Sequence, residues 1–147
     1  MKFLLVSLLA GWLLTVPNWQ LDFAQAQSEA RQAHKLILLN FSGSDWCGPC
    51  IQLKKDVFES TEFGQFAADH LVLVRADFPR KAKNQLDAGQ TARNEALAEK
   101  YNRQGKFPFT LLLDAEGHVL REWDGYPKSL TVASFVDAVT AAQSATK

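Results

Sequence analysis

The hydrophobic residues of this chain gather in short runs that are separated by polar, turn-forming segments. The runs over residues 36–41 and 71–74 are almost continuously apolar, which is typical of strands buried on both faces of a sheet. Between these runs, two sets of apolar residues recur at the spacing of one helix face: Cys50, Leu53 and Val57, then Phe63, Phe66 and Ala67. Ser60 precedes the second set and can cap its helix. The pattern therefore predicts a strand-helix-strand unit.

The second half of the chain predicts a helix, a hairpin and a final helix. Residues 78–90 lack apolar periodicity and contain a proline, a glycine and several lysines, so we expect a surface loop that leads into a helix over residues 91–101. Residues 110–113 and 118–123 flank a short turn that contains a glycine, as two antiparallel strands do. The apolar face of the last helix is marked by Val132, Phe135, Val136 and Val139.

The order of these elements predicts the fold class. Strand, helix, strand, helix, hairpin and helix imply an α/β protein, in which a mixed central β-sheet is flanked by helices on both faces. The chain has 147 residues, which suits a single domain with a core of its own.

The first residues resemble a targeting signal. Lys2 supplies a positive charge, residues 3–14 are apolar, and the small residues of Ala24-Gln25-Ala26 suit a cleavage site. We therefore expect a signal peptide over residues 1–26, a mature domain over residues 27–147 and export of the protein. A retained membrane anchor is the alternative, although the apolar run is shorter than the roughly 20 residues that a membrane-spanning helix needs.

Composition and charge narrow the class of partner. The chain carries 16 basic and 16 acidic residues, for a formal net charge of +0, and 47% of its residues are hydrophobic. Nucleic-acid-binding domains normally have a clear excess of Lys and Arg on one surface. We therefore expect no nucleic-acid partner, and we expect a monomer.

The two cysteines are the candidate chemistry. Trp46, Cys47, Gly48, Pro49 and Cys50 follow a predicted buried strand and open a predicted helix, so Cys47 lies where a helix dipole favours a thiolate. A thiolate attacks a disulfide, and the second cysteine, one helical turn later, can release the mixed disulfide. Pro49 suits the first turn because its missing N–H has no helical partner there, and Gly48 lets a substrate chain come close.

Two other interpretations of the cysteine pair stay open. The pair can be an inert disulfide, although a bridge that closes so short a loop stabilises a fold little. It can also be half of a zinc site, but there is no second cysteine pair, and His34, His70 and His118 lack the spacing of ligands. We expect no metal.

The motif Trp46–Cys50 after a buried strand, with Phe107-Pro108 ahead of residues 110–113 and a hairpin, resembles the thioredoxin superfamily, in particular its exported, periplasmic thiol-disulfide oxidoreductases. The resemblance implies a thioredoxin fold, a periplasmic location, catalysis by Cys47 and Cys50, and no cofactor beyond a redox-active disulfide between them. It also implies that the Phe107–Pro108 bond is cis, that this segment pairs with the substrate, and that Trp46 covers the cysteines.

Two residues depart from the family's pattern. Asn40 stands where many thioredoxins have a buried Asp that assists the resolving thiol, and Asn cannot act as that base. Asp45 stands nearby, but its position two residues before Cys47 predicts an exposed side chain. Phe109 separates Pro108 from Thr110, where relatives usually pass straight from proline to threonine.

The resemblance makes reduction the leading hypothesis for function. Gly48-Pro49 is the dipeptide of reducing thioredoxins, so we expect a protein that reduces disulfides of exported proteins and receives electrons from a membrane thiol reductase. A disulfide oxidase or isomerase is the alternative within the same chemistry. A redox-inert binding module with the same fold is the alternative from another class.

Overall fold

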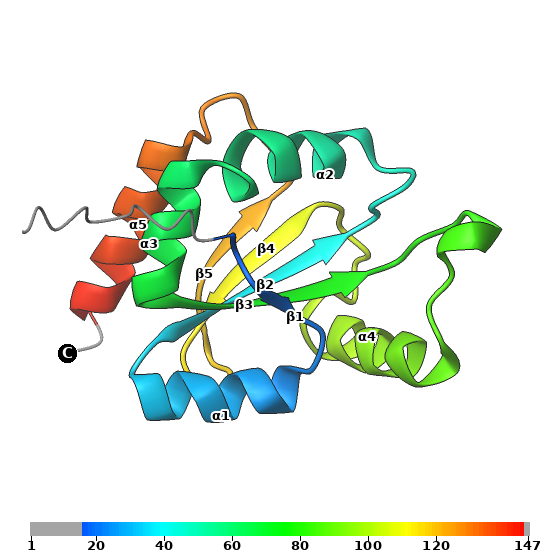
Figure 1. Cartoon of the computed structure of the whole chain (residues 1–147), viewed down its shortest axis with the longest axis horizontal. Coiled ribbons are helices and arrows are strands. Elements are labelled where there is room, and N and C mark those ends of the chain that lie inside the picture. The colour runs from blue at the N-terminus through cyan, green and yellow to red at the C-terminus, as the bar shows by residue number, and fades with distance from the viewer. Residues whose placement is uncertain (1–15, 146–147) are drawn as a thin grey trace, which may run out of the picture.

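The computed structural model describes residues 16–145, which form a central five-stranded sheet between two layers of helices (Figure 1). The strands are β1 (Trp19–Gln20), β2 (Leu36–Ser42), β3 (Leu71–Asp77), β4 (Phe109–Leu113) and β5 (Val119–Asp124). They lie in the order β1-β3-β2-β4-β5. Strand β3 runs parallel to β1 and β2, whereas the pairs β2–β4 and β4–β5 are antiparallel.

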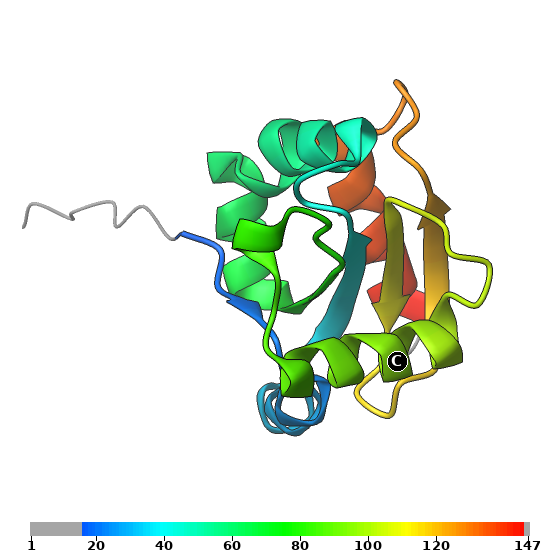
Figure 2. The same ribbon diagram turned by 90° about the vertical axis from the view of Figure 1, so that its right-hand side faces the viewer.

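The helices divide between the two faces of this sheet. Their bounds are α1 (Phe23–Ala33), α2 (Gly48–Leu53), α3 (Thr61–His70), α4 (Ala88–Tyr101) and α5 (Val132–Ala145). A π-helical stretch, η1 (Lys54–Phe58), continues α2, and a short 3-10 helix, η2 (Ala82–Asn84), precedes α4. Helices α1 and α4 cover one face, and α2, α3 and α5 cover the other (Figures 1 and 2).

Each face of the sheet has its own hydrophobic core. Successive side chains of a strand point to opposite faces, and in β2 Leu39 and Phe41 accordingly pack with α1 and α4, whereas Leu38 packs with α2, α3 and α5. The same alternation places Asn40 on the face that α2 covers. The second core contains a cluster of aromatic rings from Phe58, Phe63 and Phe135.

The predicted α/β architecture is confirmed, with differences at some boundaries. Helix α4 begins at Ala88, three residues before the expected helix, because the side chain of Asp87 accepts a hydrogen bond from Gln90 N at 2.8 Å and caps the first turn. The loop expected over residues 78–90 is therefore shorter, and it contains η2.

The N-terminal part of the described chain is folded against the rest. Helix α1 begins at Phe23, after Asp22 as its cap, and Ala26 is completely buried in the core. Strand β1, which pairs with β3, was not expected from the sequence. Residues 1–15 of the expected signal peptide lie outside the described residues, and its last residues include β1 and the start of α1.

Within residues 16–145, no helix has the length and apolar character that crossing a membrane requires.

Candidate functional site

Cys47 and Cys50 form a disulfide at the start of α2, with the two sulfur atoms 2.15 Å apart. Cys47 is the N-cap of this helix, and its Sγ accepts a hydrogen bond from the backbone N–H of Cys50 at 3.3 Å. Both cysteines are almost buried, while Gly48 and Pro49 between them are exposed. The first-turn amides and the helix dipole would therefore favour a thiolate at Cys47 once the disulfide is reduced.

The turn before Cys47 depends on a glycine. The backbone N–H of Cys47 donates to Gly43 O at 2.9 Å, which closes the turn between β2 and α2. A Cβ atom at Gly43 would overlap the indole ring of Trp46. The absence of a side chain at Gly43 therefore allows Trp46 to lie flat over the turn.

Trp46 connects this turn to two other segments. Its Nε1 donates to Phe78 O at 2.7 Å, and its ring lies 5.3 Å from the ring of Phe107. Phe78 and Phe107 also touch each other, with centroids 5.5 Å apart. The guanidinium of Arg80 stacks on the indole, with Cζ 3.7 Å from the ring centroid. The structure thus brings Phe107 of the expected site into contact with Trp46, the residue before Cys47.

The Phe107–Pro108 peptide bond is cis, and Pro108 is buried. The loop before it is held by the buried side chain of Asn102, whose amide accepts from Lys106 N and donates to Lys106 O, both at 2.9 Å. On the other side, Gly125 N donates to Pro108 O at 2.9 Å. These contacts fix the segment whose Phe107 ring meets Trp46.

Asn40 is paired inside the sheet. Its Nδ2 donates to the hydroxyl of Thr110 at 3.0 Å, and both residues are buried. This hydrogen bond satisfies an amide on the face that α2 covers, which explains why a polar side chain is tolerated there. Asn40 cannot accept a proton from a thiol.

Asp45 differs from the expectation of an exposed side chain. It is half-buried, and its carboxylate accepts hydrogen bonds from Arg80 N at 2.9 Å, Lys81 N at 3.0 Å and Asn84 Nδ2 at 2.9 Å. These donors hold the pKa of Asp45 below its ordinary value, Arg80 N–H making the largest contribution. Asp45 therefore ties the turn before Cys47 to the loop that follows β3.

A shallow hollow lies on the other side of the disulfide motif. It has a volume of about 570 Å³, and Gly48, Pro49 and Tyr126 are part of its lining. The Tyr126 hydroxyl donates to Asp56 Oδ2 at 3.2 Å, and the pKa of Tyr126 is raised by burial and by the Asp56 charge. Trp123, another residue close to it in sequence, instead packs on Phe135 in the core.

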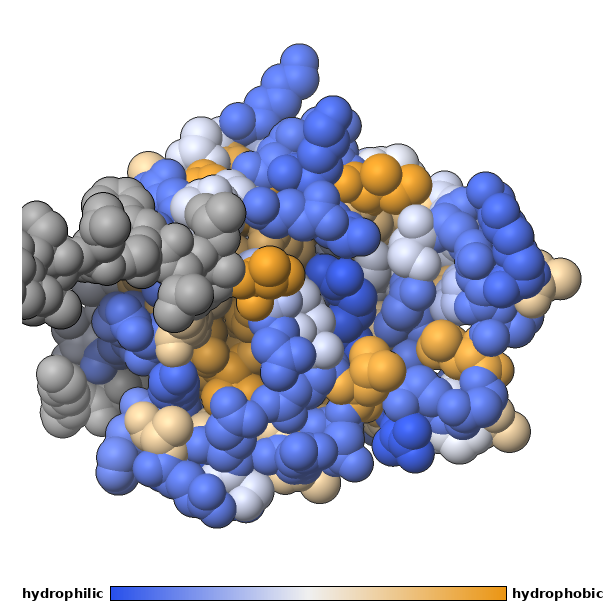
Figure 3. Space-filling view, viewed as in Figure 1, coloured by the Kyte–Doolittle hydropathy of each residue, from blue (hydrophilic) through white to orange (hydrophobic). Residues whose placement is uncertain are grey.

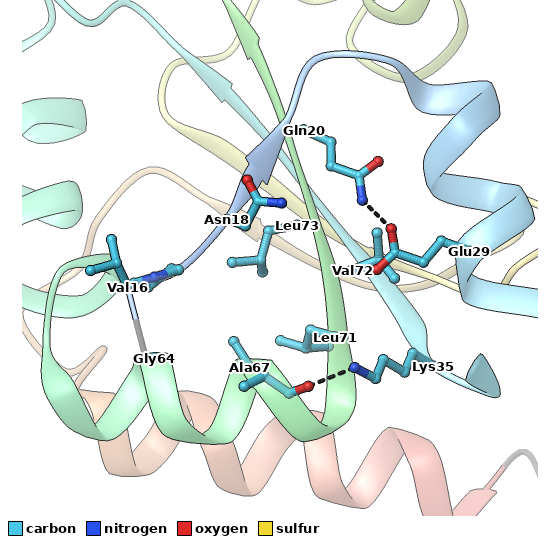
Figure 4. A pocket seen from close by; sticks show the side chains of 12 residues that line it. Val16, Asn18, Gln20, Glu29, Lys35, Gly64, Ala67, Leu71, Val72 and Leu73 are labelled. Carbon is cyan, nitrogen blue, oxygen red and sulfur yellow. Dashed lines mark hydrogen bonds between the residues drawn. The ribbon is translucent and has the colours of Figure 1, made fainter. Parts of the chain in front are cut away.

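A second hollow, of about 250 Å³, lies between β1, α1 and α3 and contains none of these site residues (Figure 4). Gln20 donates to Glu29 on one side of it, and Lys35 donates to Ala68 O on the other. Over residues 16–145 the structure contains no cluster of three or more Cys, His, Asp or Glu side chains that could hold a metal ion.

Several residues of the site were missed at the level of sequence, among them Gly43, Phe78, Arg80 and Asn102. Parallel neighbours β2 and β3 end at the same edge of the sheet, so the residues that follow them must meet there. This argument would have placed Phe78 beside the turn that begins at Gly43. No comparable signal identifies Asn102, which holds the loop before Pro108 by hydrogen bonds to the backbone of Lys106.

Comparison with known proteins connects this site to a family. The family model described as thioredoxin-like matches residues 18–115. A curated relative named disulfide bond reductase DsbH, from Chlamydia pneumoniae, is 40% identical over 103 residues, which cover 70% of this chain and 60% of the relative. A second, named thioredoxin-related protein DsbJ, from the same organism, is 33% identical over 98 residues, or 67% of this chain and 27% of the relative. The matches thus span less than two thirds of these relatives' lengths.

Solved structures agree in fold. A structure named DsbH oxidoreductase superposes with a TM-score of 0.76 and 35% identity, covering 86% of this chain and 84% of that one. A disulphide isomerase from Xylella fastidiosa Temecula1 has a TM-score of 0.57 at 20% identity, over 80% of this chain and 85% of that one. The second likeness concerns the fold alone.

Proposed function

Since the chain belongs to the thioredoxin-like family, we propose that it is a thiol-disulfide oxidoreductase that reduces disulfides through Cys47 and Cys50. The observation that carries this proposal is the position of the pair, with the Cys47 sulfur at the start of α2 facing the N–H of Cys50. The relative named disulfide bond reductase supports the direction of electron flow.

The reaction runs from the dithiol form of the protein. The Cys47 thiolate attacks one sulfur of a substrate disulfide, that bond breaks, and one substrate sulfur leaves as a thiolate while the other is bonded to Cys47. Cys50, after losing its proton, then attacks the Cys47 sulfur and releases the second substrate thiolate. Two electrons pass to the substrate, and the Cys47–Cys50 disulfide of the present structure is the product.

The neighbours of the cysteines have supporting roles in this proposal. Trp46, Gly48 and Pro49 shape the approach to Cys47, and the segment at Phe107 and Pro108 receives the substrate backbone. Asn40 is bonded to Thr110 and carries no carboxylate, so the proton of Cys50 passes to solvent or to the departing substrate thiolate. The chemistry needs no cofactor beyond the cysteine pair.

The reduction potential of the Cys47/Cys50 couple tests the direction of the reaction. Equilibration of the full chain with defined thiol-disulfide buffers should give a value near the roughly −270 mV of thioredoxin. A value near the roughly −120 mV of a strong oxidant would instead support disulfide donation, and a bond that stays closed well below about −300 mV would indicate an inert disulfide.

Trapping of mixed disulfides tests the roles of the two cysteines. Cys50→Ser should accumulate covalent complexes with disulfide substrates, because the attacking Cys47 remains and the release step is removed. Cys47→Ser is the matched control and should trap few or none. Equal trapping by both variants would contradict the assignment of Cys47 as the nucleophile.

We also propose that the protein is exported to the periplasm by its N-terminal residues 1–26 and works there as a monomer. In an oxidising compartment the disulfide must be reduced again after each turnover, which requires an electron donor such as a membrane thiol reductase. Exported protein disulfides are then the substrates. Sequencing the N-terminus of the exported protein would show whether residues 1–26 are removed.

A further inference from the structure

Arg80 is an exposed cation held on the ring of Trp46, next to Cys47. Its Cζ lies 3.7 Å from the indole centroid, and its backbone N–H donates to Asp45 at 2.9 Å. The side chain is thus restrained at both ends, by the stacked ring and by the bound backbone. Two other arginines stack on tryptophan rings away from this loop: Arg75 of β3 lies 4.3 Å from the ring of Trp19, and Arg121 of β5 lies 5.5 Å from that of Trp123.

The charge of Arg80 is not neutralised by an ion pair. The ion pairs of the described residues involve neither Arg80 nor its loop neighbours Lys81 and Lys83. Two carboxylates of this region bind other donors: Asp45 accepts from the amides of residues 80 and 81 and from Asn84, and Asp77 accepts from the N–H and the hydroxyl of Ser44. The loop projects at the right of Figure 1, where the surface in Figure 3 is mostly hydrophilic.

A guanidinium that stacks on an indole keeps the N–H donors in its plane for another partner. Planar forks of this kind pair well with carboxylates, which accept two hydrogen bonds side by side. Because the stacking restrains Arg80 before a ligand arrives, less side-chain entropy is lost on binding than for a free surface arginine.

We propose that Arg80 is a specificity residue that binds a carboxylate of the substrate, close to the substrate cysteine that joins Cys47. The protein then prefers disulfides that have Asp or Glu beside one of their cysteines. This inference rests on the proposed function for its substrate, a protein or peptide disulfide, and adds the chemistry of the flanking residue.

Paired peptide disulfides test the proposal on the full chain. Two peptides that differ only in Asp or Asn next to one cysteine are compared by kcat/KM. The wild type should prefer the Asp peptide about two- to fivefold, the range for an exposed charge pair, and added salt should reduce this preference. In Arg80→Gln the ratio of the two kcat/KM values should fall to about one, whereas Arg80→Lys should keep part of the preference for the Asp peptide. A ratio that persists in Arg80→Gln would overturn the proposal.

Matched variants separate Arg80 from general charge effects. Arg121→Gln removes an exposed arginine that stacks on a different tryptophan, Trp123, and Lys83→Gln removes a charge from the same loop. Both should keep most of the wild-type ratio between the two peptides. If Lys83→Gln abolishes the ratio as fully as Arg80→Gln does, the preference comes from the loop's overall charge, and the assignment to Arg80 is wrong.

Binding without exchange distinguishes this proposal from the proposed function. Versions of the two peptides with Ser in place of Cys cannot react, and their affinity can be followed by tryptophan fluorescence. A two- to fivefold tighter binding of the Asp peptide that disappears in Arg80→Gln supports the carboxylate site even if no disulfide is reduced. Equal affinities for both peptides in the wild type overturn it even if exchange is fast.

Discussion

At the scale of single residues, the site depends on Gly43 having no side chain. The ring of Trp46 occupies the space that a Cβ at Gly43 would need, and the same ring touches Phe107 and Arg80. The position of Trp46 therefore determines how the turn before Cys47 meets both the cis-proline segment and the following loop. Gly48 differs, because a Cβ there would meet no atom within 4 Å.

We predict that Gly43→Ala displaces Trp46 and destabilises the fold by about 1–3 kcal/mol, the usual cost of inserting an atom into a packed site. Urea unfolding gives the free-energy change, and tryptophan fluorescence reports the environment of the indole. Gly48→Ala is the matched control, and its free energy of unfolding should stay close to that of the wild type because the added methyl group faces open space. Wild-type stability and fluorescence in Gly43→Ala would show that the turn accommodates the methyl group.

At the scale of elements, Asp45 joins two segments that are more than thirty residues apart. Its carboxylate accepts from the backbone of Arg80 and Lys81 and from the side chain of Asn84. The pKa of Asp45 is lowered in the folded protein by these donors, so the ionised form is the one that stabilises the fold. This contribution is complete above the unfolded-state pKa of about 3.9 and is lost as the pH falls through the lower, folded-state pKa.

We predict a pH-dependent stability difference between the wild type and Asp45→Asn. The wild type should be more stable at pH 6, and the difference should shrink as the pH falls below about 4, because protonation removes the charge that the loop amides bind. Thermal unfolding of both proteins from pH 6 to pH 3 measures it. Asp69→Asn is the control, since Asp69 is exposed and accepts no hydrogen bond among the described residues. A difference that does not change with pH would mean that the Asp45 charge contributes nothing.

The elements also show what the sequence could and could not reveal. The strands β2 and β3 were predictable because short, almost continuously apolar runs between turn-forming segments are typical of buried strands. Strand β1 has two residues and no such pattern, so only its pairing with β3 identifies it. The start of α4 depends on a side chain of Asp87 that caps the helix, and a lone Asp within a polar loop is a weak signal.

The site was predictable to a similar extent. The motif of Trp46 to Cys50 identifies the cysteine pair and its helix, because each residue has a local reason for its place. The partners of Asp45 are 35 to 39 residues away in the chain, so no spacing rule relates them. Arg80 looks like any loop cation until the structure places it on Trp46.

At the scale of the whole molecule, sheet topology assembles the site at one edge. Strands β2 and β3 are parallel and both end there, whereas β4 is antiparallel to β2 and begins there. The turn at Gly43, the loop at Phe78 and the segment at Phe107 therefore meet, although they are far apart in the chain. A mixed sheet allows this, because an antiparallel strand begins at the edge of the sheet where its parallel neighbours end.

The N-terminal segment belongs to the same domain, because its strand β1 pairs with β3 in this sheet. Trp19 of β1 lies opposite Leu73, its ring is 5.0 Å from that of Phe58, and the guanidinium of Arg75 stacks on it at 4.3 Å. Ala26, inside α1, is completely buried in the other core. The contacts of residues 19–26 thus reach both faces of the sheet, and the expected cleavage after Ala26 would divide α1.

We predict that a chain of residues 27–147 is less stable than one of residues 17–147 by about 3 kcal/mol, since it loses the half-buried Trp19, the buried Ala26 and the Asp22 cap of α1. Urea unfolding of the two chains, each with an added initiator Met, measures the difference. Trp19→Ala in the longer chain removes this side chain alone and should cause part of the loss, because the shorter chain also lacks the backbone pairing of β1 and the first turn of α1. Equal unfolding midpoints for the two chains would mean that β1 adds no stability, and that removal of residues 1–26 on export is compatible with an intact fold.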